Sequence, residues 1–146
     1  MDKQRVVVVC PGRGSYTRDT SGYIKNHPKK STTDLSFFEK RRVQDNQLGI
    51  LKLDSMSFKS KIHMTGENAS PLIYACSLID FLSIDKSRYE IVAVTGNSMG
   101  WYSTLALGGA LSYENGYELI NTMGSMMKNK IIGGQIIYPI VNKNWE

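Results

Sequence analysis

Short apolar runs separated by polar segments recur along the chain and predict strands. A run with four consecutive valines occupies 5–10, and further apolar runs rich in β-branched residues occupy 90–94 and 135–141. Runs of this length and composition, bounded by glycine or polar residues, are typical of strands buried in a sheet. We therefore expect these three segments to form the sheet of the protein.

Longer segments carry apolar residues at helical spacing. We expect helices at about 34–47, 71–82, 101–107 and 113–127. Ser70 and Pro71 predict a helix start, with a capping hydroxyl followed by proline at the first helical position, and Ser112 predicts another cap. In the first of these helices, Phe38 and Val43 are expected to face the core.

The order of the predicted elements is strand, helices, strand, two helices and strand. This order is typical of an α/β fold with a parallel sheet and helices on both of its faces. The length of 146 residues suits one domain, with no internal repeat. Residues 17–31 indicate a surface loop, and 48–67 show no clear pattern.

Basic residues are concentrated in the first part of the chain. The formal net charge is +5, and residues 1–63 hold 13 of the 18 Lys and Arg residues. Such a surface favours anionic partners, such as the phosphates of a nucleotide-containing substrate or an acidic carrier protein. Residues 40–42 are expected to be solvated, and aromatics are not interleaved with the charges, so nucleic-acid binding is not expected.

Hydropathy and cysteine usage narrow the class of protein further. The longest apolar run, at 6–10, is too short to cross a bilayer, and no long apolar segment follows the N-terminus, so we expect a cytoplasmic protein without membrane contact. Cys10 and Cys76 stand apart from any Cys/His cluster, so we expect two small buried side chains, with neither a disulfide nor a metal site.

The segment 91–107 carries the strongest chemical signal. A β-branched run ends at Gly96, Asn97, Ser98, Met99 and Gly100, and a helix-compatible run follows at once. In a nucleophile elbow, a serine occupies the sharp turn between a strand and a helix, and the positions two before and two after it have no room for side chains. The pattern predicts Ser98 as a nucleophile.

Three stretches in the same order resemble the acyltransferase family of malonyl-CoA:acyl carrier protein transacylase and the acyltransferase domains of polyketide and fatty acid synthases. The stretch VCPGRGSY at 9–16 is similar to the family's Pro-Gly-Gln-Gly-Ser-Gln loop after its first strand. GNSMGWYSTL at 96–105 is similar to the family's elbow, Gly-His-Ser-Leu-Gly-Glu-Tyr-Ser-Ala-Leu. GGALS at 108–112 matches the small-residue turn that follows it.

The resemblance implies an α/β-hydrolase-like core and an S-acyltransferase activity in fatty acid or polyketide synthesis. Ser98 would accept the acyl group of malonyl-CoA or a related thioester and pass it to acyl carrier protein. Coenzyme A would thus be part of the substrate, with no bound cofactor. The backbone N–H groups of Arg13 and Met99 would form the oxyanion hole, where they stabilise the tetrahedral intermediate.

The chain departs from the family pattern at several positions of the site. Met123 stands where malonyl-selective members carry an arginine for the free carboxylate, so either an uncharged acyl group or an anion contact from elsewhere is implied. Asn97 replaces the usual histidine before the nucleophile, and Trp101 replaces an acidic residue. Trp101 and Met123 are candidates to line the acyl pocket, and a surface or packing role for Trp101 remains open.

The resemblance also concerns the extent of the chain. Family members have a second half with a ferredoxin-like subdomain and a catalytic histidine. Residues 1–146 correspond to the N-terminal part of a single such domain, so we expect a complementary C-terminal half to supply the general base. His27 and His63 lie upstream of Ser98 in segments that match no base motif, and both are expected to be surface histidines.

Two other functions fit the residues. An α/β-hydrolase-like esterase shares the elbow, and transfer to water rather than to a carrier thiol would identify it. A non-catalytic module that binds acyl-CoA or carrier protein would use the basic surface, and its binding would survive loss of the Ser98 hydroxyl.

Overall fold

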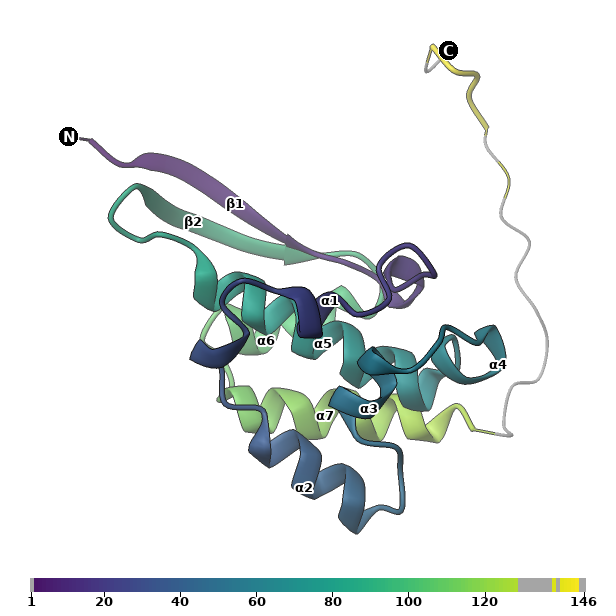
Figure 1. The fold of residues 1–146 in the computed structure, drawn as a ribbon. Helices are drawn as coiled ribbons and strands as arrows, with labels where there is room; N and C mark the ends of the chain where they lie inside the picture. The colour runs from purple at the N-terminus through teal and green to yellow at the C-terminus, as the bar shows by residue number, and fades with distance from the viewer. Residues whose placement is uncertain (1, 129–137, 139, 145–146) are drawn as a thin grey trace.

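The protein is a mixed α/β structure in which helices pack beneath a small parallel sheet. The computed structural model describes residues 2–128, 138 and 140–144. Its sheet has two parallel strands, β1 (Gln4–Cys10) and β2 (Tyr89–Gly96). Figure 1 shows α5 (Gly66–Ser83) and α6 (Gly100–Leu107) next to the sheet, with α7 (Tyr113–Met126) and α2 (Ser36–Gln44) beyond them.

One face of the sheet packs on the helices, and the opposite face is open among the described residues. Val8, Ile91 and Val94 pack against the core, whereas Val7 and Val9 are 54% and 66% exposed. The expected helices on both faces are therefore found on one face only in this part of the chain. The third predicted strand, at 135–141, lies largely outside the described residues.

α6 and α7 begin and end within one residue of the predicted positions. α6 follows the elbow directly, and α7 begins after Ser112, whose hydroxyl accepts a hydrogen bond from the N–H of Asn115 at 3.1 Å. The segments predicted as loop or left without a pattern contain short helices. These are α1 (Tyr23–Asn26), α3 (Ile50–Ser55), α4 (Ser60–His63) and the 3-10 helices η1 (Arg13–Ser15) and η2 (Lys30–Thr32).

The predicted start of α5 is wrong. The helix begins at Gly66, so Pro71 lies inside it. Proline has no N–H, and the carbonyl of Glu67 therefore lacks its usual helical donor. The guanidinium of Arg42 donates to that carbonyl at 2.6 Å, which satisfies the acceptor and allows the helix to continue through the proline.

The orientation predicted for α2 is also wrong at two residues. Val43 is 70% exposed, whereas Arg42, expected in a solvated face, is fully buried. Arg42 shares the inner face of the helix with Leu35 and Phe38, which are buried at i, i+3 and i+7 spacing. Its guanidinium also donates to the carbonyl of Leu48 and to the side chain of Asn68, so burial of the charge is compensated by hydrogen bonds.

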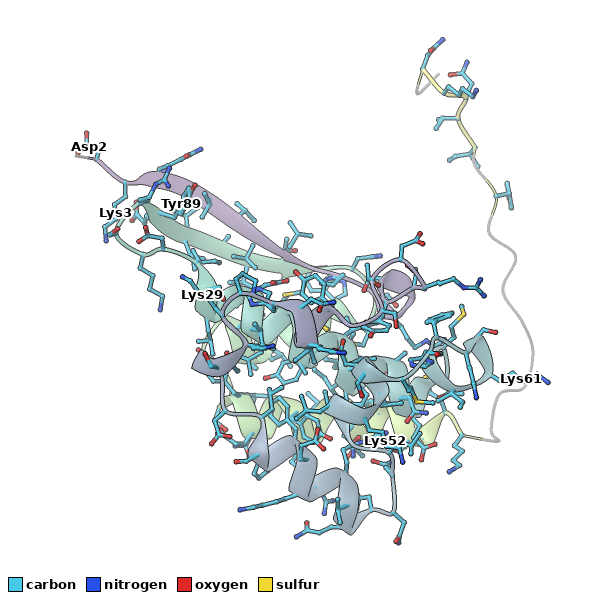
Figure 2. All side chains as sticks on the ribbon, in the orientation of Figure 1. Asp2, Lys3, Lys29, Lys52, Lys61 and Tyr89 are labelled. Carbon is cyan, nitrogen blue, oxygen red and sulfur yellow. The ribbon has the colours of Figure 1, made fainter. Side chains whose placement is uncertain are left out.

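The four lysines labelled in Figure 2 do not form one basic patch. Lys3, Lys29, Lys52 and Lys61 lie at separate positions around the periphery. In the part of the chain that the structure describes, no helix combines the length and apolarity needed to span a bilayer.

Candidate active site

The turn between β2 and α6 has the geometry of a nucleophile elbow. β2 ends at Gly96, α6 begins at Gly100, and Ser98 lies between them with a φ of +53°. A positive φ disfavours a residue with a Cβ and is found at functional sites where the surrounding structure enforces it. The turn leaves the serine exposed at the carboxyl end of the strand.

Close backbone contacts explain the two glycines of the elbow. A Cβ on Gly96 would overlap the carbonyl group of Gly100 on the other side of the turn. A Cβ on Gly100 would overlap the carbonyl oxygen of Cys10, where β1 ends. The two glycines thus allow the elbow to fold tightly and to pack against the neighbouring strand.

The loop after β1 lies against the serine. The N–H of Asn97 donates to the carbonyl of Cys10 at 3.0 Å, which fixes the elbow to the end of β1. A Cβ on Gly12 would lie 3.4 Å from the Cβ of Ser98. The backbone of Gly12, which precedes Arg13, is therefore placed immediately beside the predicted nucleophile.

Two backbone donors at this point are available to a ligand. Neither the N–H of Arg13 nor that of Met99 has an acceptor within the described part of the structure. One follows the loop glycine and the other follows Ser98 in the chain. An oxyanion hole requires unpaired N–H groups close to the attacking atom, so these two groups are candidates for one.

A pocket of about 450 Å³ opens in front of the serine. Its wall is mostly apolar and comes from the loop after β1, the elbow, α6, α5 and α7. The residues that line it are Arg13, Ser70, Ser98, Met99, Tyr102, Ile120, Met123, Gly124 and Met127. A pocket of this size and lining can hold a short apolar group next to the Ser98 side chain.

The two predicted pocket residues are placed differently. Met123 shares the pocket wall with Ser98, whereas Trp101 is 59% exposed and does not line this pocket. Ile120 and Met127, which the sequence indicated only as part of the helix's apolar face, also line it. Their spacing of three and four residues from Met123 was a signal that the same face of α7 continues into the site.

The histidines of the described chain do not reach the serine pocket. His63 is fully buried, so its expected surface position is wrong. Its Nδ1 accepts from the N–H of Lys59 and its Nε2 donates to the carbonyl of Leu53, both at 3.0 Å, and one neutral tautomer satisfies both bonds. His27 lies 3.2 Å from Asp80, and neither ring lines the pocket.

The cysteine nearest to the elbow is a poor competitor for an electrophile. Cys10 is buried at the end of β1, and burial raises the pKa of its thiol. Burial also raises the pKa of Cys76, which lies on α5 away from the serine pocket, and both cysteines are free. A covalent adduct is therefore expected on the serine rather than on a thiol.

No model of a known protein family matches the chain, and no curated protein matches it significantly.

Proposed function

We propose that the chain performs the nucleophilic half of an acyl transfer from a coenzyme A thioester to acyl carrier protein. The observation that carries the proposal is the position of Ser98, which lies in a strained turn and on the wall of a largely apolar pocket, with unpaired backbone N–H groups at Met99 and at Arg13 of the loop after β1. In fatty acid or polyketide synthesis, malonyl-CoA or a related thioester would be the donor.

The chemistry follows from this arrangement. The hydroxyl oxygen of Ser98 attacks the thioester carbonyl, and the N–H groups of Arg13 and Met99 stabilise the resulting oxyanion by a few kcal/mol each. Collapse of the intermediate breaks the carbon–sulfur bond and releases the thiol of coenzyme A. The phosphopantetheine thiol of the carrier protein then attacks the acyl-serine.

A general base accelerates both steps, and we propose that it comes from outside the described residues, so that the chain alone forms the acyl-serine slowly and does not turn over. A complementary C-terminal half, such as the resemblance implies, would bring it to Ser98. The same half would complete an α/β-hydrolase-like core around the two-stranded sheet.

A second function is favoured by the positions of the histidines. Since neither His27 nor His63 lines the pocket, the chain alone fits a module that binds acyl-CoA without transferring the acyl group. In that case, binding would persist in Ser98→Ala and no covalent adduct would form.

The test is the intact mass of the purified chain after incubation with malonyl-CoA and, separately, with acetyl-CoA. We expect a mass increase equal to one acyl group, lost in Ser98→Ala. Ser70→Ala is the matched control, because Ser70 is the other serine in the pocket wall and its loss should leave the adduct in place. An adduct that persists in Ser98→Ala, or no adduct with either thioester, would contradict the catalytic proposal.

A further inference from the structure

The serine pocket contains one charged side chain, that of Arg13. Its Nη1 lies 3.0 Å from the sulfur of Met127, so the side chain extends from the loop beside Ser98 to the far end of α7. A thioether sulfur is a weak acceptor, and a guanidinium carries five strong donors. Most of the hydrogen-bonding capacity of this cation is therefore unused within the described structure.

No carboxylate balances this charge in the described residues. The pocket wall contains neither Asp nor Glu, and Arg13 takes part in none of the ion pairs found there. Other cations of the molecule do have partners: Arg41 pairs with Glu118 at 3.0 Å and Lys128 with Glu67 at 3.1 Å. A guanidinium that faces an apolar chamber without an anion favours an anionic ligand in that chamber.

We propose that the side chain of Arg13 binds a carboxylate on the acyl group of the thioester and so selects carboxylated acyl groups. The inference rests on the proposed function of Ser98 and deepens it by naming a specificity-determining residue. The thioether of Met123 cannot pair with a carboxylate, but the Arg13 side chain lines the same pocket and carries a guanidinium that can.

Arg13 is placed so that its backbone can donate to the oxyanion while its side chain binds the carboxylate. In a malonyl group, a single carbon separates the thioester carbonyl from the free carboxylate, so the cation must lie close to the oxyanion site. The backbone N–H of Arg13 is one of the two proposed oxyanion donors. The flexible side chain of the same residue can leave the sulfur of Met127 and form a bidentate pair with the carboxylate.

Binding measured without turnover tests the inference. The dissociation constants of malonyl-CoA and acetyl-CoA are determined by calorimetry in a Ser98→Ala background, alone and combined with Arg13→Gln, Arg13→Lys or Arg18→Gln. We expect Arg13→Gln to weaken malonyl-CoA binding by roughly tenfold to a hundredfold and acetyl-CoA binding by less than about twofold. Arg13→Lys keeps the charge without the planar fork and should retain part of the preference.

Arg18→Gln is the matched control, since it removes one positive charge from an exposed position outside the pocket wall. It should change neither constant by more than about twofold, because an exposed charge is screened by salt. Circular dichroism and the urea midpoint verify that each variant is folded. Among the described residues, the partly exposed Arg13 side chain has no hydrogen-bond partner other than Met127, so Arg13→Gln should retain the fold.

Three results would overturn the inference. If Arg13→Gln weakens the binding of malonyl-CoA and acetyl-CoA equally, Arg13 binds the phosphates that the two thioesters share. If both thioesters bind equally well and Arg13→Gln does not change either constant, Arg13 has no role in selecting the acyl group, and the acyl-transfer proposal is unaffected. Failure of every variant to bind either thioester would overturn the proposed function together with the inference.

Discussion

Ser98 occupies a backbone conformation that its own side chain disfavours. Two non-glycine residues of the described chain have a positive φ, Asn46 and Ser98. Asparagine adopts this region comparatively easily, whereas serine does so less often. The serine is thus the position at which a hydroxyl is kept in spite of a conformational cost.

That cost can be measured with a glycine at the same position. The free energy of unfolding of Ser98→Gly should be about 1 kcal/mol higher than that of Ser98→Ala, because alanine keeps a Cβ in the left-handed region and glycine has none. Both variants lack the hydroxyl, so neither should form an acyl adduct. Urea unfolding of the two proteins gives the comparison, and equal stabilities would mean that the turn is not strained.

The tight contact at Gly100 predicts a second effect on both stability and labelling. Gly100→Ala forces a methyl group against the carbonyl of Cys10, so the elbow and the end of β1 must separate. We expect a loss of about 2–4 kcal/mol in unfolding free energy and loss of the acyl adduct, since the Met99 N–H moves away from its partner donor.

Gly14→Ala provides the control for this experiment. A Cβ at Gly14 meets no atom within 4 Å, and its φ is not in the left-handed region, so the same substitution should change stability by less than about 0.5 kcal/mol. A Gly100→Ala protein as stable and as reactive as Gly14→Ala would show that the two segments are not packed as described.

At the scale of elements, α5 depends on a residue from another helix. The carbonyl that Pro71 leaves without a donor is bonded by Arg42 of α2, and this links the two helices across the interior. Burial lowers the pKa of the Arg42 guanidinium, while hydrogen bonds to four acceptors, including the carbonyl of Leu48, compensate for its burial.

Arg42→Met should therefore destabilise the protein by roughly 3 kcal/mol, because methionine fills similar volume but leaves buried acceptors unpaired. Arg41→Met is the neighbouring control. Its ion pairs with Asp45 and Glu118 are partly exposed, and their loss should cost about 0.5 kcal/mol. Urea midpoints measure both values, and similar effects of the two substitutions would contradict the structural role of Arg42.

The dependence of α5 on Arg42 also shows where sequence reasoning ends. The elbow, α6 and α7 could be predicted because local rules decide them, such as glycine spacing and the Ser112 cap. The start of α5 could not, since the donor that compensates Pro71 lies 25 residues before Glu67. The same holds for the pocket, where Met123 was a candidate but the approach of Arg13 to Met127 depends on tertiary packing.

The open face of the sheet carries exposed apolar side chains. Val7 and Val9 are exposed on the face opposite the helices, and Val92 of the neighbouring strand is 41% exposed. Contiguous exposed apolar side chains on a strand favour association, and among the described residues each of the two strands also has one edge without a partner strand. We expect the chain by itself to associate through this face.

Replacing Val7 and Val9 together by threonine should weaken that association at least severalfold and reduce binding of an apolar dye, because the hydroxyls favour hydration and the β-branched shape is kept. The free energy of unfolding should change by less than about 0.5 kcal/mol, since both side chains are mostly in water.

Val8→Thr is the neighbouring control. Val8 packs on the core, so its substitution should lower the free energy of unfolding by about 1–2 kcal/mol and leave association unchanged. Sedimentation velocity across a concentration series separates the two cases, and an unaltered association of the Val7/Val9 variant would mean that the open face of the sheet is not the surface through which the chain self-associates.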